Sequence, residues 1–261
     1  MTCKNCQSSF EGNFCPECGQ SATVKRFSFG YFAIESVYSS LDLERGQGMG
    51  ILLLLQRPGS SIRNYIQGKR MRLFAPAKFL LLVGAIVTIL VLRHNPFLVI
   101  EEDNMEMQSK IKELFPIISA WYFRYFDGFW HFANEFVTLT NIISIPVFSL
   151  FSFILFSYTK FNYTENLIMN MYIICMQLLA VVPFLGILEV PFLMPYKDVI
   201  LAFYTLLTVC YNIWVYVTLF KEANFSGLFL ATTATICGYI GNVVLVHILF
   251  FLLTQAGMSP I

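Results

Sequence analysis

The sequence predicts an all-α membrane protein with about five transmembrane helices, which follow a small amino-terminal zinc ribbon and amphipathic interfacial helices. Three observations predict this class. The 261 residues are 57% hydrophobic and only 13% charged, whereas a soluble domain carries about 25% charged residues. The apolar residues gather in long runs, as a bilayer requires of each crossing helix. Four of the seven cysteines lie within the first 18 residues.

The amino-terminal cysteines form two Cys-x-x-Cys pairs, Cys3 with Cys6 and Cys15 with Cys18. Two tight turns at this spacing can present four thiolates to one tetrahedral ion. A segment of about 20 residues buries too little apolar surface to fold unaided, so structural Zn²⁺ would supply the missing stability. We therefore expect residues 1–24 to form a zinc ribbon that is disordered without its metal.

Paired disulfides, a redox-active dithiol and an iron site are the alternatives for these cysteines. Disulfides need an oxidising compartment, whereas the topology predicted below places the segment in the cytoplasm. A redox dithiol is expected near a βαβ pattern, which the sequence lacks. Nucleic-acid binding is not expected, because Lys4 is the only basic side chain in residues 1–24. Docking to a protein is the use that remains.

Residues 25–73 are predicted to form cytoplasmic amphipathic or interfacial helices and a basic juxtamembrane segment. Apolar residues recur at helical spacing in residues 27–43, starting at Ile34. The apolar run at 51–55 is too short to span, and a second helical stripe stops at Gly68. Six basic residues are expected at the headgroups, where they anchor topology or recognise lipid: Arg57, Arg63, Lys69, Arg70, Arg72 and Lys78.

Several short motifs run through the first third of the chain. They are the first cysteine pair, the runs at 14–20, 57–59 and 65–70, and the run at 76–80. Together they resemble the bacterial membrane proteins of domain-of-unknown-function family number 3667. A second signature lies at 161–167, where the resemblance implies histidine at the position of Asn166. The resemblance covers most of the chain and implies an architecture, a zinc ribbon before several spans, with no known activity.

Five spans are predicted within a transmembrane domain at 74–261. The ten basic residues before the first span exceed the four in the loop at 93–141, which also carries seven acidic residues. The positive-inside rule therefore predicts a cytoplasmic amino terminus and an external carboxyl terminus, and the family resemblance implies a bacterial inner membrane. Aromatic residues at 115–135 predict a helix on the outer leaflet, with a ligand-stacking platform as the alternative. The predicted spans are 74–92, 142–158, 167–188, 199–220 and 228–253.

Polar side chains recur inside the last three predicted spans, where they must face other helices or water rather than lipid. They either join helices by hydrogen bonds or line a cavity for a small solute or a lipid headgroup. The sequence predicts no catalytic residue, because it shows no Ser/His/Asp, HExxH or paired-acid arrangement. The candidate intramembrane cavity residues are Asn166, Asn170, Gln177, Thr205, Thr208, Asn212, Asn242 and His247.

Three functional hypotheses follow. The first is a membrane scaffold or regulator that docks a cytoplasmic protein through its structural zinc ribbon. The second is a transporter or channel-like protein for a small solute or lipid, which uses the polar stripes of spans three to five. The third is a membrane-embedded enzyme, which the missing catalytic pattern makes the weakest. The expected partners are the bilayer and a protein partner or a second copy of the chain, and no nucleic acid.

Overall fold

A computed structural model of the chain describes residues 1–41, 48–94, 125, 128, 129, 132, 137–188 and 190–255. These residues form eight α-helices and two short 3₁₀ helices. Within the described ranges there is no strand, only the isolated bridges between Thr2 and Ser9 and between Phe14 and Ser21. The predicted all-α class is confirmed.

The first four helices belong to the amino-terminal third of the chain. Helix α3 begins at Pro58, whose missing N–H is harmless at a helix start, and it ends before Gly68, whose φ is 108°. The predicted break at 57–59 and the predicted stop at Gly68 are both found. Helix α1 packs Phe32 inward, whereas Ile34 is 61% exposed. The helices are α1 (Phe29–Leu41), α2 (Gly48–Gln56), α3 (Pro58–Ile66) and α4 (Pro76–His94).

The carboxyl-terminal half contains the long apolar helices. Left-handed residues with φ of 63° at Lys160 and 59° at Lys221 lie in the two turns that connect them. Each of the five predicted spans falls mainly in one helix, counting α4. The elements are α7 (Val137–Leu155), η1 (Ser157–Thr159), α8 (Tyr163–Leu188), η2 (Pro191–Tyr196), α9 (Lys197–Phe220) and α10 (Phe225–Gln255).

Three described helices are long and apolar enough to cross a membrane: α8 over Tyr163–Ile187, α9 over Val199–Phe220 and α10 over Phe225–Gln255. Two shorter apolar helices, Pro76–Val91 and Leu139–Leu155, accompany them. By length and composition, therefore, the chain has the helices of a membrane protein.

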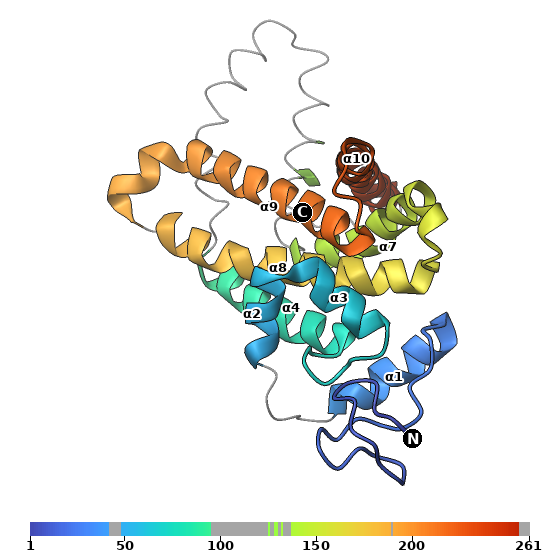
Figure 1. Cartoon of the computed structure of the whole chain (residues 1–261). Helices are drawn as coiled ribbons and strands as arrows, with labels where there is room; N and C mark the ends of the chain where they lie inside the picture. Colours follow the sequence, from blue (N-terminus) through green and yellow to red (C-terminus); the bar gives the residue numbers. More distant parts are fainter. Residues whose placement is uncertain are drawn as a thin grey trace, which may run out of the picture.

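Helix α8 lies in the middle of the described helices and contacts α4, α7 and α9 as well as α2 and α3 (Figure 1). Its residues Ile168, Met169 and Tyr172 are fully buried. The surrounding helices expose apolar side chains outward, such as Ile89 on α4 and Ile240 on α10. An apolar outer surface around a buried central helix suits a lipid environment.

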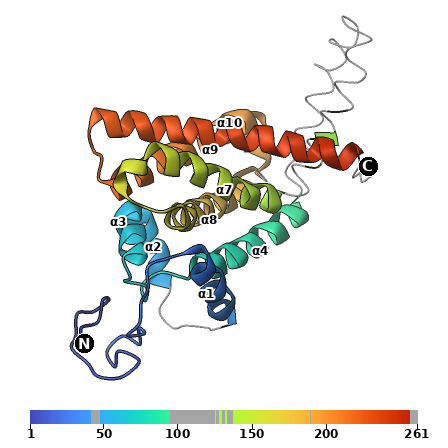
Figure 2. The same cartoon turned by 90° about the vertical axis from the view of Figure 1, so that its right-hand side faces the viewer.

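The turn between α7 and α8 and the turn between α9 and α10 lie against each other, and we call residues 156–162 and 219–225 the junction. The rings of Phe156 and Phe220 stack there with their centroids 4.1 Å apart. Helix α3 packs on the junction, where the Arg63 Nε atom donates to the carbonyl of Leu219 at 2.6 Å. Figures 1 and 2 show that α8 and α10, which leave the junction, run in different directions.

Most of the predicted aromatic helix at 115–135 and the acidic residues at 101–106 lie outside the described residues. Tyr125, Gly128, Phe129 and Phe132 are described and helical. The Phe129 ring stacks on His247 with 3.8 Å between centroids, and Phe129 and Phe132 are buried with residues of α10. These described aromatics therefore cover the second half of α10.

Candidate metal centre and its attachment to the helices

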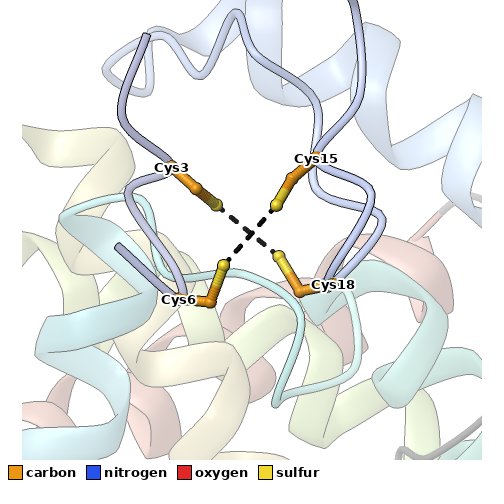
Figure 3. Close-up of side chains that lie close together, drawn as sticks. All are labelled: Cys3, Cys6, Cys15 and Cys18. Atoms are coloured by element: carbon orange, nitrogen blue, oxygen red, sulfur yellow. Dashed lines mark hydrogen bonds between the residues drawn. The ribbon is translucent and has the colours of Figure 1, made fainter. Parts of the chain in front are cut away.

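The side chains of Cys3, Cys6, Cys15 and Cys18 converge on one point (Figure 3). Their four sulfur atoms all lie within 4.8 Å of one another, and the sulfurs that face each other across the cluster are 3.5 Å apart in each case. Tetrahedral coordination at about 2.3 Å per bond places sulfurs about 3.8 Å apart. The four thiols therefore form one cluster of the size that a metal ion requires.

Two matching turns position the four thiols. The N–H of Gln7 donates to the carbonyl of Cys3 at 3.0 Å, and the N–H of Gly19 donates to that of Cys15 at 2.8 Å. Both residues that follow a cysteine pair have positive φ, 65° at Gln7 and 74° at Gly19. The sequence signals this backbone at Gly19, because glycine tolerates it without strain. Gln7 adopts the same conformation without that signal.

The thiols differ in their acidity. A hydrogen bond from the Ser8 hydroxyl, 3.2 Å from the Cys15 sulfur, lowers the pKa of Cys15 to about 6. The backbone N–H of Cys6 lowers the pKa of Cys3, whereas burial raises the pKa of Cys18 to about 11. Metals bind the thiolate form. Ser8 therefore supports the site from outside the ligand set, and the sequence analysis missed it.

Arg70 holds the segment that follows the cysteine cluster. Its guanidinium lies 3.8 Å from the centre of the Phe27 ring, and its Nη1 atom donates to both carboxylate oxygens of Glu35 at 3.0 Å. Its Nη2 atom donates to the carbonyl of Lys25 at 2.7 Å, and its backbone N–H donates to the side chain of Gln20 at 3.0 Å. Arg70 was predicted at the lipid headgroups, but only 9% of its side chain is exposed.

A second attachment joins the same segment to the first turn of α8. Asn162 Oδ1 accepts the N–H of Glu165, and a Glu165 carboxylate oxygen accepts the N–H of Asn162, both at 2.8 Å. This reciprocal pair is a capping box, which stabilises a helix start. Arg26 then donates to both oxygens of Glu165 at 2.8 Å, and Asn162 Nδ2 donates to the carbonyl of Phe27. The capping box thus also binds residues 26–27.

Glycines allow two close approaches in this region. A Cβ atom on Gly59 would lie 2.4 Å from the backbone nitrogen of Leu219, so only glycine lets α3 approach α9 this closely. A Cβ atom on Gly68 would lie 3.1 Å from side-chain atoms of Lys4 and Val24. These glycines explain two of the short sequence motifs as contacts between segments.

The motifs can now be compared with known families. Residues 50–88 match the model of a family described as Protein of unknown function (DUF3667). This match confirms the family for the motifs at 57–59, 65–70 and 76–80, whereas the motifs at 3–20 and 161–167 lie outside the matched residues. The DUF3667 segment contains most of α2, all of α3, most of α4, and the residues Gly59, Gly68 and Arg70. Comparisons with curated proteins and with solved structures find no match.

The other predicted basic residues also lie within the DUF3667 segment, in different surroundings. Arg57 and Arg72 are exposed, whereas Lys69 and Lys78 are half-buried. The Arg63 guanidinium lies 5.7 Å from the centre of the Phe161 ring at the junction, and burial lowers its pKa. A common headgroup site for the six predicted residues stays a prediction.

One hydrogen-bonded network includes two of the predicted intramembrane polar residues, Asn166 and Asn170. The Ser152 hydroxyl donates to Asn166 Oδ1 at 3.0 Å and accepts from Asn170 Nδ2 at 3.2 Å. The Tyr216 hydroxyl donates to Asn170 Oδ1 at 2.8 Å, which joins α7, α8 and α9. The sequence analysis missed Ser152 and Tyr216, since a lone hydroxyl in an apolar run gives no pattern.

The remaining polar residues lie apart from this network. Gln177 Nε2 donates to the carbonyl of Thr208 at 3.3 Å, whereas the exposed Thr205 donates to Leu201 on its own helix. Asn212 is 1% exposed, and neither of its side-chain amide atoms has a hydrogen-bond partner among the described residues; the same holds for Asn242 Oδ1. His247 lies with the aromatic cluster around Phe129.

Proposed function

We propose that this protein is an integral membrane scaffold or regulator, which docks a cytoplasmic protein partner through a structural zinc ribbon. The supporting observation is the double attachment of residues 20–28, by Arg70 to the DUF3667 segment and by Arg26 to α8. We call residues 1–22 the cysteine module. A partner bound to this module would be coupled through these contacts to the central helix α8. Phe14, which is 66% exposed on the module, offers an aromatic anchor for such a partner.

Zinc is the metal that suits the four thiols. Four sulfur ligands in tetrahedral reach favour zinc or iron–sulfur sites, and a set complete with four cysteines leaves no open position for catalysis. The buried apolar residues of the module are Phe10, Cys3 and Cys15, a core too small to fold alone. The ion therefore supplies the stability that the apolar core lacks.

The proposed topology has five crossings and a cytoplasmic amino terminus. Helices α4 and α7 have 19 residues each, which gives about 28 Å of helix, close to the roughly 30 Å of bilayer hydrocarbon. Residues 25–26, the DUF3667 segment and the junction also gather basic residues, which favours the cytoplasmic side of the inner membrane for these parts. These are Lys25, Arg26, Arg57, Lys69, Arg72, Lys160 and Lys221.

Transport of a small polar solute is the second candidate. It is favoured by Asn212, whose amide is buried without a partner among the described residues, since such a group normally binds something polar. The hydrogen bonds among Ser152, Asn166 and Asn170 support the first proposal instead, because they use these side chains to join helices.

Affinity capture from membranes tests the docking role. We compare the native protein with Phe14→Ser, with Cys15→Ser/Cys18→Ser, and with the control Phe192→Ser, which changes an 80% exposed phenylalanine in η2. The partner should be lost with the first two variants and retained with the control. Recovery of the same proteins with all four would refute docking through the module.

Chemical labelling tests the orientation separately. Thr23 lies on the exposed surface after the cysteine module. A Thr23→Cys variant should react with a membrane-impermeant maleimide only after the cells are opened. Reaction in intact cells would place the module outside and overturn the proposed topology.

A further inference from the structure

A cavity of about 350 Å³ lies where the cysteine module, the end of α3 and the junction meet. Its walls come from three parts of the chain that are distant in sequence: the amino-terminal segment, the end of α3 at Ile66 and Gln67, and residues 159–165. Lys4, Lys25 and Arg26 belong to the amino-terminal segment, Lys160 and Phe161 to the turn between α7 and α8, and Glu165 to the first turn of α8. The cavity therefore exists only while the module is attached to the helices.

The cavity is electropositive. Four basic side chains line it against a single carboxylate, Glu165. That carboxylate is already engaged, because Arg26 donates to both of its oxygens at 2.8 Å and the N–H of Asn162 donates to one of them. In the part of the chain that the structure describes, no ion pair involves Lys4, Lys25 or Lys160. Three lysines thus line one space, and none of them forms an ion pair with the described part of the protein.

Backbone contacts hold the lysine-bearing segments in place. Arg26 Nη2 donates to the carbonyl of Lys160 at 2.7 Å, and Arg70 Nη2 donates to the carbonyl of Lys25 at 2.7 Å. Lys4 Nζ donates to the carbonyl of Val24 at 3.0 Å, which leaves two of its three N–H groups for another acceptor. The backbone segments that carry the lysines are therefore held beside one another before any ligand arrives, which reduces the entropic cost of binding.

We propose that this cavity binds a phosphate-bearing anion. Lysine ammonium groups are common phosphate partners, and the volume is at the lower end of small-molecule sites, enough for one phosphate group and part of what carries it. The phosphate could come from a lipid headgroup or from a soluble phosphorylated molecule, since both present the same chemistry. This binding does not depend on the proposed docking role.

Binding measurements on the full-length, detergent-purified protein test the proposal in two arms. Radiolabelled inorganic phosphate in equilibrium dialysis reports soluble anions. Nanodiscs of phosphatidylcholine with and without phosphatidic acid, followed by lipid analysis of the repurified protein, report a lipid phosphate. The cavity variant is Lys25→Glu/Lys160→Glu, and the control is Lys197→Glu/Lys221→Glu, which changes the total charge equally outside the cavity lining.

The cavity variant should weaken binding of whichever probe the native protein holds by about tenfold or more, since two close charges change sign. The control should change binding much less than the cavity variant, because its two charges lie outside the cavity lining and are screened by salt. The milder Lys25→Gln/Lys160→Gln variant should lose an intermediate amount, and bound metal content should confirm that each variant is folded. Selective loss in either arm supports the proposal and identifies the phosphate source. Equal losses in the cavity and control variants, or binding of neither probe by the native protein, would overturn it.

Discussion

Arg70→Ala should release the cysteine module from the membrane helices without removing its metal. The substitution deletes the charged hydrogen bonds to Glu35 at 3.0 Å, which contribute about 1.5–3 kcal/mol. It also deletes the cation–π contact to Phe27 at 3.8 Å, which contributes about 1–2 kcal/mol when desolvated. Because Glu35 is partly exposed, we take the lower part of these ranges, about 3 kcal/mol in all. The attached state should then be disfavoured about 100-fold.

Limited proteolysis of residues 20–28 measures this release. When opening is fast relative to cleavage, the cleavage rate follows the population of the open state, so it should rise by about 100-fold in Arg70→Ala. Arg72→Ala is the control, because Arg72 is a neighbouring exposed arginine. Metal content should remain at the native value in both variants, since Arg70 contributes none of the four thiols. Unchanged cleavage in Arg70→Ala, or equal increases in both variants, would refute the assigned role.

Three further perturbations address the ligand set, the helix contact and the helix start. Ser8→Ala removes the hydrogen bond that lowers the pKa of Cys15 to about 6, so the metal must displace a thiol proton at pH 7. The apparent zinc affinity, measured by chelator competition, should fall about tenfold at pH 7 and approach the native value above about pH 8.5. A loss of affinity that does not depend on pH would contradict this cause. Gly59→Ala should lower the free energy of unfolding by about 1–3 kcal/mol in thermal unfolding, because α3 must move away from α9. Gly30→Ala, which has open space at its Cβ position, should not lower it. Similar losses of stability in both variants would refute the close-contact explanation. Asn162→Ala should destabilise the start of α8 by about 1–2 kcal/mol and speed hydrogen exchange of its first turn, so unchanged exchange would argue against the capping box.

Residue patterns predicted the helices well, because lipid requires long apolar runs that few other structures use. Each predicted span lies mainly in a helix, and the break at Pro58 and the stop at Gly68 are found. The cysteine spacing likewise predicted a four-thiol cluster. These features depend on residues close in sequence, which is why the sequence alone reveals them.

Contacts between distant segments were harder to predict. Arg70 lies in a basic run that is typical of residues at the lipid headgroups, yet it packs against Phe27 and Glu35. Nothing near it in the sequence signals those partners. Asn162 and Glu165 do have the spacing of a capping box, a signal that the sequence analysis did not use. Their third partner, Arg26, follows only from the folded chain.

The contact between Arg26 and Glu165 also bears on the order in which parts of the protein fold during synthesis. Arg26 precedes Glu165 by 139 residues, whereas the four clustered cysteines lie within the first 18 residues. Because amino-terminal units fold first as the chain emerges from the ribosome, the cysteine cluster can form long before Glu165 has been translated. Arg70 emerges next, and the clamp to α8 closes only after α4 and α7 have been made. In the nascent protein, the cysteine cluster is therefore complete before the helices that it attaches to have been made.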